Sequence, residues 1–198
     1  MRSQNIDQGW EFQYGLNSGF QDPSKAKSGR KVNLPHDYMI EGDVTRTAPA
    51  AGAGGYYTAG VASYTKYIEI PEAWADEEIY LHFDGVMMNS TVDINGGKAC
   101  LQHNGYIPFA INITPYVYFG ESNRITVIVN PSIQPNSRWY TGAGIFRSVT
   151  LIHVPKLHIA CDGIYGYTKE IEYDADGISA AAYLHTEVEI TNHTLENK

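Results

Sequence analysis

The chain has 198 residues, of which 43% are hydrophobic and 18% charged, an ordinary composition for a globular protein with one large domain or one domain and part of another. Its net charge of −8 disfavours nucleic acid and anionic membranes as partners, because phosphate binding requires a basic patch. A neutral ligand such as a sugar remains compatible with this charge. The 15 tyrosines suit both strands and binding surfaces.

Alternation of hydrophobic and polar residues predicts β-strands along most of the chain. Strand-like segments occupy residues 63–70, 78–83, 88–94, 108–113, 124–130 and 145–154. The side chains that this alternation places on the core face are Ile79, Leu81, Phe83, Ile125, Val127 and Val129. Many short strands separated by turns are typical of a β-sandwich or a β-barrel.

Turn residues separate these strands, and helix is scarce. The turns fall at Asp84-Gly85, Asn95-Gly96-Gly97, Asn104-Gly105 and Gly120-Glu121-Ser122-Asn123. The best helix candidate is residues 71–78, which begin with a proline at a favoured first-turn position. Residues 114–117 are expected to form one further turn.

The glycine-rich segment 49–60 is predicted to contain no regular element. One interpretation is a mobile loop. The other is a loop that becomes ordered against a ligand or a neighbouring domain.

A break near Val154-Pro155-Lys156 suggests a domain boundary. Two strand-like stretches follow, joined by a turn at residues 174–177. Two strands cannot build a core alone, so we expect residues 156–198 to be the start of a second domain that is incomplete at Lys198.

The cysteine spacing and the hydropathy of the sequence argue against a zinc or redox protein and against a membrane-spanning one. Cys100 and Cys161 fit no zinc or redox spacing, and we expect two reduced thiols. The sequence contains no membrane-length apolar run, and its first residues lack the apolar stretch of a signal peptide. A cytoplasmic location is therefore the default expectation, or a secreted or periplasmic one if a leader has been removed.

We find no catalytic constellation in the sequence. The seven histidines form no zinc-protease pattern, no nucleophile elbow is present, and residues 52–55 lack the lysine of a phosphate loop. We therefore predict no catalytic residue, no metal site and no cofactor within this chain.

Residues 136–144 are the best candidate for ligand binding. Arg138, Trp139 and Tyr140 precede a turn flanked by Gly142 and Gly144, and Asn136 lies just before them. Planar aromatic side chains outside a strand are suited to a flat ligand, and arginine offers paired donors.

Asp37 lies in segment 34–38, which has neither strand nor helix periodicity, and it is a further candidate for ligand binding. Two interpretations remain open for it: a loop cap that accepts backbone N–H groups, or a ligand contact that supports the site.

Six motifs in order carry a resemblance to a known family. They are GWEFQYG (9–15), LPHDY (34–38), SYTKYIEIP (63–71), FDGVMMNSTVDING (83–96), HNGYIPFAINIT (103–114) and SRWYTGAGIFRSV (137–149). This series resembles the N-terminal sugar-binding domain of glycoside hydrolase family 2, which contains β-galactosidases, β-glucuronidases and β-mannosidases. Tyr38, Thr141 and Ser148 depart from the family's common residues, and they leave the choice among galactose, glucuronate and mannose open.

The resemblance implies an all-β fold, with a jelly-roll sandwich over residues 1–155 and the first strands of an immunoglobulin-like sandwich over 156–198. It implies that a TIM barrel of the same polypeptide, outside this chain, carries two catalytic glutamates. It also implies that the loop containing Arg138, Trp139 and Tyr140 reaches the barrel mouth as a substrate-binding rim, with Asn136 and Asp37 as weaker members. The alternative for Trp139 is a plug between the sandwich edge and the barrel.

We therefore expect the non-catalytic part of a retaining glycoside hydrolase, best matched by a β-galactosidase type, with a β-glycoside as carbohydrate partner. The alternatives are a free-standing carbohydrate-binding module and a structural β-sandwich protein. No nucleic-acid or membrane partner is expected, and the formation of a homo-oligomer is left open.

Overall fold

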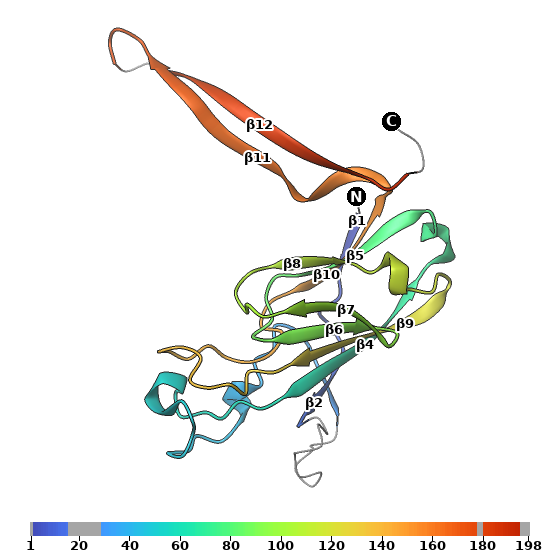
Figure 1. The fold of residues 1–198 in the computed structure, drawn as a ribbon, viewed down its shortest axis with the longest axis vertical. Helices are drawn as coiled ribbons and strands as arrows, with labels where there is room; N and C mark the ends of the chain where they lie inside the picture. The colour runs from blue at the N-terminus through green and yellow to red at the C-terminus, as the bar shows by residue number, and fades with distance from the viewer. Residues whose placement is uncertain (1, 16–28, 178–179, 195–198) are drawn as a thin grey trace. The chain divides into compact units, whose positions relative to one another are not determined.

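A computed structural model of the chain describes residues 2–15, 29–177 and 180–194 (Figure 1). The chain divides into two compact units, Met1–His153 and Val154–Lys198. The described residues form β-strands and short 3₁₀ helices, so the prediction of an all-β fold is confirmed. Within these residues, no helix is long and apolar enough to cross a membrane.

The first unit contains two β-sheets. The larger sheet has the strand order β3 (Arg30–Val32), β2 (Trp10–Tyr14), β4 (Ala62–Ile70), β9 (Glu121–Val129), β6 (Ser90–Ile94) and β7 (Gly97–Gln102). The smaller sheet has the order β1 (Arg2–Asn5), β10 (Val149–Pro155), β5 (Glu77–Phe83) and β8 (Phe109–Asn112). The pairs β1–β10, β5–β8, β2–β3, β2–β4, β4–β9, β6–β7 and β6–β9 run antiparallel.

One hydrophobic core is shared by the two sheets of this unit. The predicted core residues of β5 and β9 all have 0% exposure, which confirms the alternation argument: Ile79, Leu81, Phe83, Ile125, Val127 and Val129. Trp10 is also fully buried, and its indole N–H donates to the carbonyl oxygen of Ile6 at 2.8 Å. A buried indole thus keeps its polar edge satisfied, as burial requires.

The predicted helix at residues 71–78 is wrong. Residues Glu72–Trp74 form only a 3₁₀ turn, η4, and β5 begins at Glu77. Eight residues are too few to form a stable helix without strong tertiary packing. Glu77 and Glu78, at the end of the segment, belong to strand β5 instead. The side chain of Glu78 accepts hydrogen bonds from the side chains of Asn112 and Thr114.

Two other local predictions have different outcomes. The predicted turn at 114–117 is confirmed as the 3₁₀ helix η5 (Thr114–Tyr116). The prediction that residues 49–60 contain no regular element is wrong, because Ala51–Gly54 form the 3₁₀ helix η3. Small side chains allow this turn to fold tightly, and a Cβ on Gly54 would approach that of Ala50 to 2.7 Å. A further 3₁₀ helix, η2, spans Met39–Glu41.

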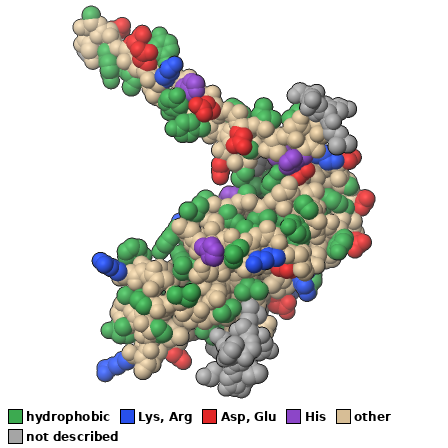
Figure 2. Space-filling view, in the orientation of Figure 1, with side chains coloured by type: hydrophobic (Ala, Val, Ile, Leu, Met, Phe, Trp, Pro, Cys, Tyr) green, Lys and Arg blue, Asp and Glu red, His purple; other side chains and the backbone are tan. Residues whose placement is uncertain are grey.

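The second unit is a two-stranded antiparallel sheet within its described residues. Its strands are β11 (Leu157–Tyr173) and β12 (Ala180–Asn192). They confirm the prediction of two strands after residue 156. Figure 2 shows hydrophobic side chains along this hairpin, and several are more than half exposed, among them Ile164, Leu184 and Ile190. Cys100 of the first unit and Cys161 of the second are both free thiols.

Candidate functional site

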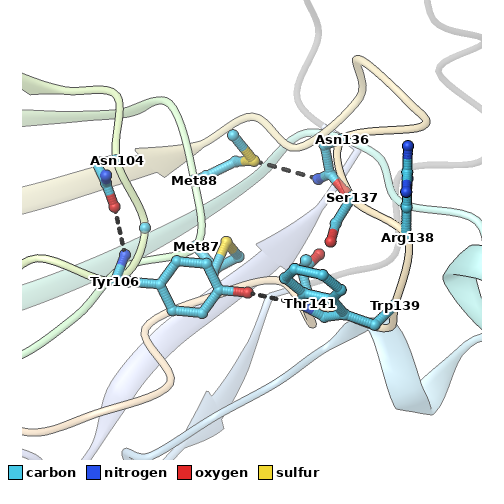
Figure 3. Close-up of a pocket in the computed structure, with 10 residues that line it drawn as sticks. Met87, Met88, Asn104, Tyr106, Asn136, Ser137, Arg138, Trp139 and Thr141 are labelled. Carbon is cyan, nitrogen blue, oxygen red and sulfur yellow. Dashed lines mark hydrogen bonds between the residues drawn. The ribbon is translucent and has the colours of Figure 1, made fainter.

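Loops at one end of the first unit surround a hollow of about 560 Å³ (Figure 3). They are the β5–β6, β7–β8 and β9–β10 connections, all parts of the sandwich unit. The described residues that line the hollow are Met87, Met88, Asn104, Gly105, Tyr106, Asn136, Ser137, Arg138, Trp139 and Thr141. The segment that the sequence singled out therefore contributes one wall of a concave surface.

Trp139 and Tyr106 lie side by side in this hollow, although they come from different loops. The indole N–H of Trp139 donates to the hydroxyl oxygen of Tyr106 at 3.3 Å. Trp139 is 63% exposed and Tyr106 is 50% exposed, so both rings present a large apolar area to solvent. Large exposed aromatic side chains in a concave surface are typical of a binding site.

Polar groups around the aromatic pair retain hydrogen-bonding capacity. The side-chain amide of Asn136 donates to the sulfur of Met88 at 3.2 Å, and a thioether is a weak acceptor. The hydroxyl oxygen of Ser137 has no hydrogen-bond partner among the described residues either, but it is buried and not accessible from the hollow. Arg138 is exposed, and in Figure 3 its side chain extends away from the Tyr106 ring. No carboxylate is among the described lining residues.

Asp37 supports the wall of the hollow from behind. One carboxylate oxygen, Oδ1, accepts the backbone N–H groups of Met39 at 3.0 Å and Ala143 at 2.9 Å. The other oxygen, Oδ2, accepts the hydroxyl of Tyr140 at 2.6 Å. Gly142 is needed here, because its φ is +73° and a Cβ would lie 2.6 Å from Asp37 Oδ2.

Tyr140 is held from two sides. Its ring also packs edge-on against Tyr57, with ring centroids 5.7 Å apart. The loop after η3 therefore contacts the segment 136–144, called the rim segment below. Burial, and then the hydrogen bond to the Asp37 carboxylate and its negative charge, raise the pKa of Tyr140 well above the usual value for tyrosine. Tyr140 is therefore a protonated donor that ties the rim to the sandwich.

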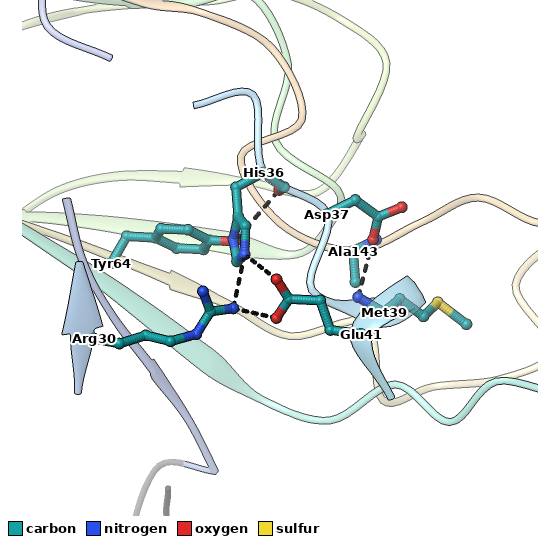
Figure 4. A network of polar contacts seen from close by, with 7 residues as sticks. All are labelled: Arg30, His36, Asp37, Met39, Glu41, Tyr64 and Ala143. Carbon is teal, nitrogen blue, oxygen red and sulfur yellow. Dashed lines mark hydrogen bonds and ion pairs between the residues drawn. The ribbon is translucent and has the colours of Figure 1, made fainter. Parts of the chain in front are cut away.

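A second polar network lies beneath the same segment (Figure 4). The buried hydroxyl of Tyr64 is 2.7 Å from His36 Nδ1, and His36 Nε2 is 3.1 Å from a Glu41 oxygen. Glu41 also forms an ion pair with Arg30. The backbone N–H of His36 donates to the carbonyl oxygen of Ile145 at 2.8 Å, which fixes the β9–β10 connection.

The charges in this network are set by burial and by contact. Burial lowers the pKa of His36, although the neighbouring Glu41 acts in the opposite direction, and this favours the neutral imidazole. Partial burial alone would raise the pKa of Glu41, but the hydrogen bonds from Arg30 and His36 lower it overall. The network therefore combines a neutral histidine with an ionised pair at the surface.

Comparison with known proteins assigns the fold to a family. Residues 3–155 match the family model described as glycosyl hydrolases family 2, sugar binding domain. The chain belongs to glycoside hydrolase family 2. The β-galactosidase BoGH2A of Bacteroides ovatus is 38% identical over 164 residues, which are 82% of this chain and 19% of that protein. A putative β-glucuronidase of Formosa agariphila is 32% identical, over 90% of this chain and 17% of that protein.

A solved structure also extends across both units. The crystal structure of a β-glycosidase from Bacteroides vulgatus superimposes with a TM-score of 0.82 and 32% identity, and it covers 99% of this chain and 25% of that chain. The chain thus spans less than a fifth of the length of the two curated relatives, at 19% and 17%. The matched part of this chain, residues 3–155, is the sugar binding domain of that family.

Within this family 2 domain, the structure brings only some of the predicted site residues to the hollow. Asn136, Arg138 and Trp139 line it. Asp37 and Tyr140 lie outside its described lining and hold its wall instead, so the geometry of Asp37 is that of the loop cap that the sequence allowed.

Sequence reasoning missed Tyr106 and Asn104 as lining residues, and it missed the His36 network. An aromatic residue directly after the Asn104-Gly105 turn is the same kind of signal that identified Trp139 next to its glycines. The histidine beside Asp37 offered a weaker signal, because its partners are distant in sequence.

Proposed function

We propose that this chain is the non-catalytic sugar-binding portion of a retaining family 2 glycoside hydrolase, and that Arg138, Trp139 and Asn136 contribute to its substrate-binding rim. The observation that carries the proposal is the hollow itself. An exposed indole and an amide line one concave surface, Arg138 is among its lining residues, and no carboxylate is among those described. Sugar rings offer C–H faces to aromatic planes and hydroxyls to amide and guanidinium groups.

In this proposal, bond cleavage depends on residues outside the chain. A retaining glycosidase needs two carboxyl groups about 5–5.5 Å apart, one as nucleophile and one as acid and base. The rim described above supplies binding and orientation but no proton transfer. We therefore expect the purified chain to hydrolyse no aryl galactoside, glucuronide or mannoside. Turnover that survives repurification and is lost on mutating a carboxylate of this chain would contradict that expectation.

Two further parts of the proposal concern domain organisation. We infer that β11 and β12 are the first strands of an immunoglobulin-like domain, which the match across 99% of the chain to a β-glycosidase structure supports. We also infer that a TIM-barrel domain of the same polypeptide faces the rim. A sequence of the gene beyond Lys198 tests both inferences, because a free-standing carbohydrate-binding module would show a stop codon there.

The sugar is proposed to be a β-linked galactoside, because the relative named as a β-galactosidase is 38% identical, against 32% for the one named as a putative β-glucuronidase. Measuring kcat/KM of the full-length enzyme with matched aryl β-galactoside and aryl β-glucuronide substrates tests this choice. A higher kcat/KM for the glucuronide would overturn it.

The rim is tested by Arg138→Ala and Trp139→Ala in the full-length enzyme. Loss of a binding contact should lower kcat/KM by about tenfold to about a hundredfold, while some activity remains. Arg124→Ala and Tyr118→Ala are matched controls, because both residues are exposed and neither lines the hollow. Unchanged kinetics with an unchanged melting temperature would defeat the proposal, and a lowered melting temperature alone would indicate that Trp139 acts as a plug.

A further inference from the structure

The β7–β8 loop places a second aromatic side chain in the hollow, which the rim segment does not account for. Tyr106 follows the Asn104-Gly105 turn, and its backbone N–H donates to the side-chain oxygen of Asn104 at 2.8 Å. Its hydroxyl accepts the indole N–H of Trp139 (Figure 3). The hydroxyl oxygen of Tyr106 therefore satisfies the indole N–H of Trp139, and both rings keep apolar faces for another group.

The position of Tyr106 is built into the packing below it. Gly105 lies so close to Met87 that a Cβ would come within 2.7 Å of the Met87 methyl carbon and closer still to its sulfur. Met87 is 2% exposed, and it exchanges backbone hydrogen bonds with Gly144, at 2.9 Å from Met87 N and 2.8 Å from Gly144 N. One buried residue thus anchors both the loop of Tyr106 and the loop of Trp139.

Within this chain, the arrangement leaves two large apolar surfaces exposed. Trp139 and Tyr106 are 63% and 50% exposed, although each would stabilise the fold more if it were buried. Close to them, the exposed residue Asn136 donates its side-chain amide to a thioether, which is a weak acceptor. Flat apolar faces beside a weakly bonded neutral amide match the two kinds of surface that a pyranose ring presents.

We propose that Tyr106 and Trp139 together form a platform on which one pyranose ring of a β-glycoside stacks, with Asn136 hydrogen-bonding its hydroxyl groups. This inference rests on the proposed function, and it adds Tyr106 to the residues that contact substrate. The platform binds through ring faces, so the tyrosine ring matters more than its hydroxyl.

The chain itself permits a direct test by nuclear magnetic resonance. It contains three tryptophans, Trp10, Trp74 and Trp139, so the indole N–H region of a ¹H–¹⁵N spectrum is simple and the Trp139→Phe variant assigns it. Titration with methyl β-D-galactopyranoside or methyl β-D-glucuronide should shift the Trp139 signal progressively. The signal of the fully buried Trp10 should stay in place and reports that the core is intact.

Variants separate the ring from the hydroxyl. Tyr106→Ala should weaken the sugar-dependent shift about tenfold or abolish it, whereas Tyr106→Phe should retain most of it because the stacking face remains. Tyr118→Ala is the matched control, since Tyr118 is 58% exposed and does not line the hollow. Sorbitol supplies hydroxyl groups without a ring and should cause no comparable shift.

The inference is overturned if neither glycoside shifts the Trp139 signal, if sorbitol shifts it equally, or if Tyr106→Ala binds as the parent chain does. These failures are distinct from a failure of the proposed function. That function depends on the kinetics of the Arg138 and Trp139 variants in the full-length enzyme, which can be impaired even where Tyr106 contributes nothing.

Discussion

The carboxylate of Asp37 accepts the hydroxyl hydrogen of Tyr140, a residue 103 positions further along the chain, at 2.6 Å. The same carboxylate caps the backbone N–H groups of Met39 and Ala143. A single side chain thus joins the turn after β3 to the rim segment. The rim can present Trp139 to solvent because its neighbour Tyr140 is fastened to the sandwich.

Replacing Asp37 should destabilise the first unit. Asp37→Ala leaves three donors without their acceptor, and we expect the free energy of unfolding to fall by about 2–3 kcal/mol, the scale of hydrogen bonds to a charged group. Urea unfolding followed by tryptophan fluorescence measures the change. Asp43→Ala is the control, because Asp43 is an exposed aspartate nearby. Equal stability of the two variants would contradict the role assigned to Asp37.

Tyr140 should make stability decrease at alkaline pH. Its pKa is raised in the folded chain, so above about pH 10, where the unfolded chain loses this proton, the folded chain still holds it. The folded state then binds more protons, and the free energy of unfolding falls as pH rises. Tyr140→Phe should show a smaller fall than the parent chain between about pH 9 and about pH 11. Identical slopes in urea titrations of the two proteins would refute this.

His36 should make the stability of the folded chain decrease at acidic pH. Burial lowers its pKa in the folded chain, so the unfolded chain binds this proton first as pH falls below about 6.5. Stability contributed by the neutral imidazole is present above that value and is lost on acidification. His36→Gln should therefore lose less stability than the parent between about pH 7 and about pH 5. A steeper loss in the variant would show that the sign is wrong.

Alternation was sufficient to predict the strands and the core, because burying one face of a strand imposes a period of two on the sequence. Every residue predicted to face the core from β5 and β9 is fully buried. The hairpin turn at Asn95-Gly96 was predictable too, because Asn-Gly is the preferred pair where both central residues need a positive φ. The structure has φ of +53° and +91° at these two residues. Such features depend on neighbours in sequence.

Features that depend on distant partners could not be predicted in this way. The sequence suggested a helix at 71–78, but pairing in the smaller sheet determines the conformation of Glu77 and Glu78. Asp37 left two interpretations open because its partner Ala143 is 106 residues away. The turn before Tyr106 is a local signal, but its contact with Trp139 is not, because the two residues are 33 positions apart.

The β11–β12 hairpin should exchange its amide hydrogens faster than β9. Its described residues are mostly exposed and form a sheet of two strands, whereas β9 lies between β4 and β6 with Ile125 and Val127 fully buried. Local opening of such a hairpin is expected to need less free energy than opening the core. Exchange measured by mass spectrometry should be at least about tenfold slower in β9. Equal protection in a dilute, monomeric sample would argue against this.

Gly144 should be among the least replaceable residues of the rim. Its φ is +132°, and a Cβ there would meet the hydroxyl of Tyr64 and lie 2.5 Å from the carbonyl oxygen of His36. Gly144→Ala therefore combines backbone strain with a collision against rigid neighbours, and it should cost more than about 2 kcal/mol of stability.

Gly96→Ala is the matched control for the collision. Gly96 also has a positive φ, +91°, but no atom lies within 4 Å of the position of its Cβ. This variant should therefore lose only the backbone contribution, about 1–2 kcal/mol. Thermal or urea unfolding of both variants separates the two effects, because the difference between them measures the close packing of Gly144 on Tyr64 and His36. A Gly144→Ala variant no less stable than Gly96→Ala would mean that the rim can shift to make room, and the wall of the hollow would then be far more adaptable than its contacts indicate.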